Sequence, residues 1–71
     1  MVAISIVLRA LREGRPLDVR ELTPACVDPK AGLRVREILA PHVGGDVVEL
    51  STRPLRWIVA AYNARLSREV R

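Results

Sequence analysis

The residues in this sequence most able to do chemistry are its arginines. Eleven of the twelve basic residues are arginine and Lys30 is the only lysine, while eight acidic residues leave a formal net charge of +4. Arginine holds phosphate or carboxylate through a planar set of donors, whereas lysine acts as a point charge. Together with a sequence pI of about 10.6, this composition favours an anionic partner, and nucleic acid is the first candidate.

The sequence gives little support for a disulfide, a metal site or a catalytic site. Cys26 and His42 are the only cysteine and the only histidine, so an intramolecular disulfide is excluded and a zinc site with four nitrogen or sulfur ligands cannot form. The carboxylates are scattered, and a triad cannot be argued from one histidine. Gly44 and Gly45 lack the following Lys and Ser/Thr of a phosphate loop. We therefore expect no enzymatic activity, no metal and no cofactor.

The length of 71 residues predicts a single domain over 1–71. A chain of this size buries only about 60% of its unfolded surface, so a second copy or another partner is expected to add to the core. No uncharged run is longer than the eight residues of Met1–Leu8, far fewer than the roughly 20 residues that span a bilayer, and no secretory signal is visible. We expect a soluble, cytoplasmic protein without membrane contact. The absence of Gln and the many Arg and Glu are compatible with a thermophile.

Apolar spacing predicts a mostly α fold with one short β element. A first helix over 1–13 carries the stripe Ile4, Val7, Leu8 and Leu11 and ends at Gly14, and Asp18 caps a short second helix. A third helix begins at Asp28 and Pro29 and runs to Pro41, although a hairpin turn over 28–32 is the alternative. The turn at 44–46 precedes a predicted strand, Val47–Leu50.

A long amphipathic helix closes the chain. Ser51 or Thr52 is expected to cap it, and its apolar stripe comprises Leu55, Ile58, Val59, Tyr62, Leu66 and Val70. Trp57 falls on the opposite face, one turn after Arg53 and close to three small residues: Ala60, Ala61 and Ala64. This face predicts a homodimer interface. The alternatives are that Trp57 folds onto its own chain or stacks on a nucleic-acid base.

Residues 7–39 resemble the first three helices of winged-helix and helix-turn-helix DNA-binding proteins. The likeness lies in Leu-Arg-Glu-Gly at 11–14, Asp-Val-Arg-Glu-Leu at 18–22 and the short turn into 33–39. In those families the third helix enters the major groove. The resemblance implies a transcriptional regulator or chromatin-associated protein that contacts duplex DNA through Lys30, Arg34, Arg36 and Arg20. The alternative for such arginines is a solvated face of helical ion pairs, as at Arg34 and Glu37.

A second resemblance concerns the only cysteine. Residues 17–22, the run Cys-Val-Asp-Pro at 26–29, residues 45–50 and Pro54 are similar to the SirA-like sulfur-carrier family. That family carries a persulfide on a cysteine at a helix N-terminus, where the thiol pKa is lowered. The resemblance implies Cys26 as a thiol site, whereas a buried small hydrophobe is the plain alternative. A small adaptor subunit of a larger assembly is a further alternative to DNA binding.

Overall fold

A computed structural model describes residues 2–22 and 28–69 of the chain, and every regular element within them is helical. The prediction of a mostly α fold is confirmed. Cys26 lies outside the described residues. In chain order the elements are α1 (Val2–Glu13), the 3₁₀ turn η1 (Val19–Leu22), α3 (Pro29–Val43), α4 (Val47–Leu50) and α5 (Leu55–Glu69).

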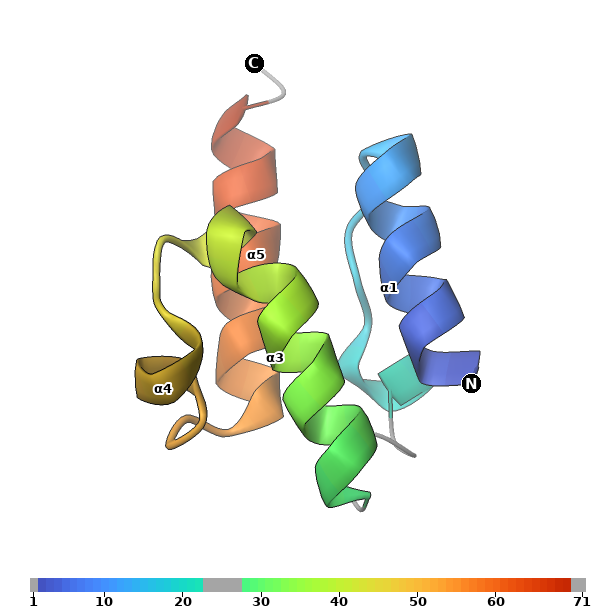
Figure 1. Ribbon diagram of the computed structural model, residues 1–71. Helices are drawn as coiled ribbons and strands as arrows, with labels where there is room; N and C mark the ends of the chain where they lie inside the picture. The colour runs from blue at the N-terminus through green and yellow to red at the C-terminus, as the bar shows by residue number, and fades with distance from the viewer. Residues whose placement is uncertain (1, 23–27, 70–71) are drawn as a thin grey trace.

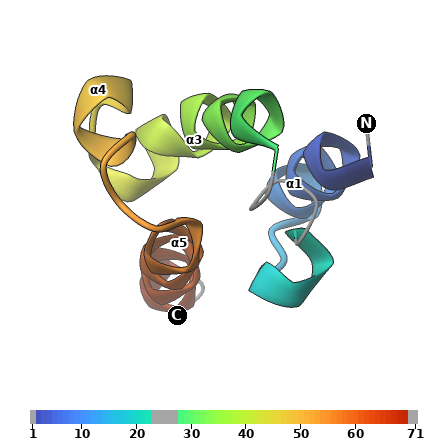
Figure 2. The same cartoon turned by 90° about the horizontal axis from the view of Figure 1, so that it is seen from below.

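The three long helices run in the same general direction, with their N-terminal ends at the lower end of the molecule (Figure 1). Helix α3 is central, because it packs against α1, α4 and α5. Seen from below, α3 lies across one side of α1 and α5, and η1 fills the space beside α1 (Figure 2). Both α1 and α3 must therefore be followed by a segment that brings the chain back to the lower end.

The core forms where these helices meet. Its largest fully buried side chains are those of Val7, Leu22, Val35, Leu39 and Ile58. The apolar residues of α3 (Ala31, Val35, Ile38 and Leu39) line this core, as does the stripe predicted for α5 within the described residues. Burial of apolar side chains is the main favourable term in folding.

The stripe predicted for α1 is rotated in the structure. Leu8 is 51% exposed, while Ala3, Val7 and Ala10 face the core. The two alanines have little side chain, so α1 can approach its neighbours closely along this line. Leu8 fits the helical spacing equally well but is displaced by packing, which spacing within one helix does not reveal.

The predicted end of the first helix at Gly14 is confirmed, and α3 ends at a second glycine, Gly44, beyond the predicted end at Pro41. Gly14 and Gly44 adopt φ values of 66° and 75°, a left-handed conformation that glycine adopts at little cost. After Gly14, the Arg15 N–H donates to Ala10 O at 2.9 Å. At the start of α3, Asp28 accepts from the Lys30 N–H at 3.1 Å. This cap and the helix that follows contradict the alternative of a hairpin turn over 28–32.

The first return segment, residues 14–18, is held by α5. Asn63 accepts a hydrogen bond from the Leu17 N–H at 2.8 Å and donates one to the Leu17 carbonyl at 2.7 Å. The Tyr62 hydroxyl donates to the Arg15 carbonyl at 2.8 Å. Leu17 is the buried residue of this irregular segment, and its backbone groups need such partners because an unpaired polar group away from water is costly.

The predicted strand Val47–Leu50 is wrong: these residues form the single helical turn α4. Asp46 caps the turn by accepting from the N–H groups of Val48 and Glu49 at 2.7 and 3.4 Å. An isolated strand here would find no strand to pair with among the described residues, whereas a capped turn satisfies its own backbone. The cap thus outweighs the β-propensity of the two valines.

Two further boundaries differ from the predictions. The hydroxyls of Ser51 and Thr52 donate back to carbonyls of α4 at 2.7 and 2.9 Å, so these residues close α4 and do not cap α5. Helix α3 continues past Pro41 to Val43. A proline in the last turn removes only one backbone donor, and the left-handed Gly44 ends the helix instead.

We expect Leu39→Ala to lower the free energy of unfolding by about 2–5 kcal/mol, because it opens a cavity in the fully buried core. Leu33→Ala is the matched control on the same helix, since Leu33 is 44% exposed, and should change stability by no more than about 0.5 kcal/mol. Urea denaturation followed by circular dichroism measures both. Equal losses in the two variants would contradict the assigned core.

Candidate nucleic-acid interface

Two of the four arginine and lysine residues predicted to bind DNA are paired with carboxylates. Arg20 contacts Asp18 at 2.9 Å, and Arg34 contacts Glu37 at 3.1 Å. The Arg20 side chain is 87% exposed, and exposed pairs of this kind contribute only about 0–1 kcal/mol. The ion pair between Arg34 and Glu37 that spacing predicts is confirmed. It places a carboxylate in the middle of the outward face of α3.

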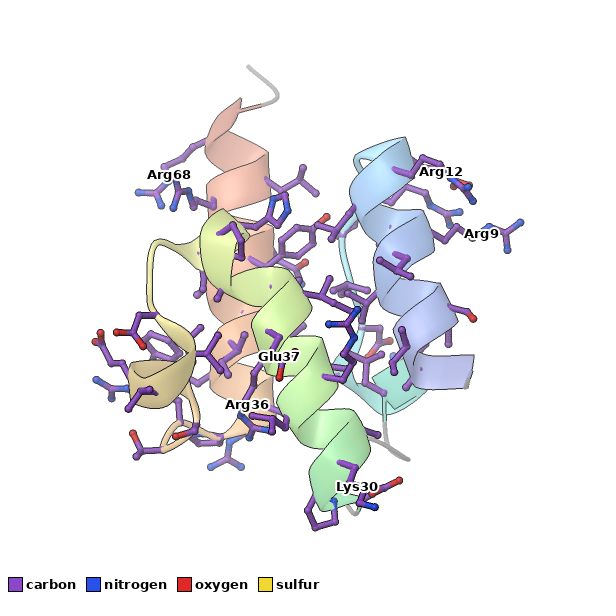
Figure 3. All side chains as sticks on the ribbon, viewed as in Figure 1. Arg9, Arg12, Lys30, Arg36, Glu37 and Arg68 are labelled. Carbon is purple, nitrogen blue, oxygen red and sulfur yellow. The ribbon has the colours of Figure 1, made fainter. Side chains whose placement is uncertain are left out.

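Arg36 has a structural role. Its Nε donates to the Leu50 carbonyl at 3.2 Å and its Nη2 donates to the Arg53 carbonyl at 3.0 Å. Figure 3 shows this side chain at the lower part of α3, toward the segment between α4 and α5. The guanidinium therefore ties α3 to the turn that precedes α5, and its donors are directed at these carbonyls.

Lys30 lies apart from these contacts. It is exposed in the first turn of α3, at the lower end of the molecule (Figure 3). No carboxylate lies within ion-pair distance of its side chain among the residues that the structure describes. Of the four predicted residues, Lys30 is thus the one whose charge is neither paired with a carboxylate nor used to hold the fold.

The N-terminal end of α5 carries basic residues that were not among those predicted to bind DNA. Arg53 and Arg56 flank the start of this helix, and within the described chain neither forms an ion pair. The guanidinium carbon of Arg53 lies 4.9 Å from the ring centroid of Trp57, in a cation–π contact. A positive charge at a helix N-terminus is disfavoured by the helix dipole. Helix stability therefore does not explain why two arginines lie here.

The outward side of α5 beyond its first turn carries an exposed tryptophan, small residues and one more arginine. Trp57 is 45% exposed, Ala60 and Ala64 are exposed, Ala61 is partly buried, and Arg68 is exposed in the last turn. We call Arg53, Arg56, Trp57, Ala60, Ala64 and Arg68 the α5 outer face. The expected position of Trp57 opposite the core is confirmed, and its contact with Arg53 leaves much of the indole in solvent. Glu69 is the only acidic residue in the sequence of α5.

Other kinds of site find little support. Within residues 2–22 and 28–69, no group of three His, Cys, Asp or Glu residues could hold a metal ion. In that same part of the chain, every helix is too short or too polar to cross a membrane. The proposed thiol site at Cys26 falls outside the described residues and stays a prediction.

No protein-family model, curated protein or solved structure matches this chain. The winged-helix and sulfur-carrier resemblances therefore stay predictions. The chemistry of the exposed side chains is the remaining guide to function, and the α5 outer face is its most basic unpaired part.

Arg36→Ala is expected to lower the free energy of unfolding by about 1–3 kcal/mol, because two carbonyls lose a charged donor. The control is Arg34→Ala, which breaks an exposed ion pair and should cost at most about 1 kcal/mol. Chemical denaturation of both variants at one salt concentration makes the comparison. A larger loss for Arg34→Ala than for Arg36→Ala would contradict the structural role of Arg36.

Arg20 holds the pKa of Asp18 below its ordinary value of 3.8, mainly through the side-chain hydrogen bond and also through its backbone N–H. The folded state thus favours the ionised carboxylate. This contribution to stability is present above pH 3.8 and is lost as the pH falls through the lowered pKa. Arg20→Ala should raise the Asp18 pKa part of the way back, since the backbone donor stays. An NMR titration tests this, and an unchanged pKa would contradict the pairing.

Proposed function

We propose that this protein binds nucleic acid through the α5 outer face. The main support for this proposal is that Arg53 and Arg56 lie at the N-terminal end of α5 and have no carboxylate partner in the described chain. Two positive charges at this position destabilise the helix through its dipole. Bound phosphate would offset that electrostatic cost, because a helix N-terminus favours negative charge. The net charge of +4 favours the same class of partner.

Helix α3, which the helix-turn-helix resemblance implies as the DNA-contacting helix, is less suited to this role. Its outward side combines Arg34, whose charge is paired with Glu37, with Leu33, which is 44% exposed. The carboxylate of Glu37 would face phosphate or base acceptors, which it repels. Lys30 adds a further phosphate contact on this proposal, since the N-terminal ends of α3 and α5 lie at the same end of the molecule (Figure 1).

Self-association through α5 is the competing proposal for the same surface. An antiparallel pair of α5 helices that seats Trp57 against Ala64 of a second copy would bring Arg53 opposite Arg68 at both ends. Like charges would then meet twice, and none of the six residues that define the outer face is acidic. Juxtaposed like charges oppose association. A polyanion complements this face better than a second copy does.

Affinity on this proposal comes from neutralising phosphates and releasing their counterions. Binding should therefore weaken steeply as salt is added. A double variant, Arg53→Gln with Arg56→Gln, should weaken binding and reduce the slope of log K against log salt by about 2. The hydrogen bond from Arg36 uses the backbone carbonyl of residue 53, so it survives the substitution. Fluorescence anisotropy of labelled oligonucleotides at several salt concentrations measures both quantities.

The matched control is Arg9→Gln with Arg12→Gln, which removes the same charge from α1 on the opposite side of the molecule (Figure 3). This control should keep most of the affinity and slope. Equal loss in both double variants would show a diffuse charge effect and contradict a site on α5. Absence of binding even at low salt would contradict nucleic-acid binding altogether. The adaptor alternative, in which an acidic protein segment docks on this face, would then take precedence.

A further inference from the structure

We infer that the nucleic acid bound at the α5 outer face is single-stranded, with an unpaired base stacked on Trp57. This inference rests on the proposed function and names its substrate class. It starts from a feature that phosphate binding leaves unexplained: the middle of a basic face is apolar, with Trp57 followed by Ala60 and Ala64. Phosphates contact cations and N–H donors and gain nothing from a patch of indole and methyl groups.

The geometry around Trp57 suits a planar ligand. Arg53 lies over the ring at 4.9 Å, so one guanidinium already covers part of the indole while the residue stays 45% exposed. The next residues along the same side of α5 are alanines, whose side chains end at Cβ and leave room beside the ring. A base placed on the uncovered side of the indole would complete a stack of guanidinium, indole and base. Arginine and aromatic planes are both known partners for bases.

The exposure of the indole favours single strands over duplexes. In a duplex the base faces are covered by their neighbours, and only base edges are accessible in the grooves. An unpaired base offers its whole face. Arg56 and Arg68 lie about 18 Å apart along the helix axis, given a rise of about 1.5 Å per residue. Because Trp57 directly follows Arg56, Arg56 is placed to contact a phosphate beside the stacked base, and Arg68 a phosphate further along the strand.

Trp57 is the only tryptophan of the chain, so its intrinsic fluorescence reports directly on this site. Titration of the wild-type protein with a short oligothymidylate should quench this fluorescence at low salt. A duplex of the same length should bind more weakly and quench less. Trp57→Leu should lose about 5- to 100-fold in affinity for the single strand, as expected for one lost stacking contact. Its salt dependence should be unchanged, because no phosphate contact is removed.

Trp57→Phe is the conservative control, since it keeps an aromatic face and should lose less affinity than Trp57→Leu. Because the residue is half-exposed, both variants should fold, and circular dichroism checks this. Salt-dependent binding with no quenching, no preference for single strands and no effect of Trp57→Leu would overturn the inference and leave the proposed function standing. No binding to either nucleic acid would overturn both. A mass in solution that shows dimers lost in Trp57→Leu would assign the face to a second copy and overturn the inference.

Discussion

The structure depends on one constraint: the three long helices run in the same direction, so the chain must return after α1 and again after α3 through segments that are largely irregular. Returning segments leave backbone N–H and C=O groups without helical partners. Side chains from the helices supply those partners. Asn63 binds both backbone groups of Leu17 in the first return. Arg36 binds two carbonyls in the second, that of Leu50 at the end of α4 and that of Arg53 before α5. The helices that pack around the core, α3 and α5, thus also hold the return segments in place.

This constraint also determines where the candidate site lies. The second return ends at the residues that begin α5, so Arg36 fixes the backbone of Arg53 to the central helix. Arg53 in turn lies over Trp57. An exposed aromatic ring held by such a chain of contacts loses less conformational entropy on binding than a freely rotating one. Arg36, which the sequence analysis assigned to DNA contact, thus holds the backbone of Arg53 in place.

The helices could be predicted from the sequence because apolar spacing and helix caps are local signals. The buried stripe of α5, the cap at Asp28 and the left-handed Gly14 follow from residues within a turn or two of each other. The turn at Val47–Leu50 could not be predicted from its valines alone, because Asp46 and the lack of a pairing strand decide it. The exposure of Leu8 likewise depends on which neighbour α1 meets.

The candidate site was harder to predict for an electrostatic reason. A surplus of arginine identifies the class of partner, but ion pairs and carbonyl contacts decide which cations remain available. Arg20 and Arg34 have carboxylates two or three residues away, a spacing visible in the sequence. The role of Arg36 depends on carbonyls 14 and 17 residues distant. A signal that could have found Arg53 and Arg56 was present: they are basic residues at the start of a helix, beside an outward tryptophan. Helices favour acidic residues at that position, so a departure from this preference indicates function more strongly than the total charge does.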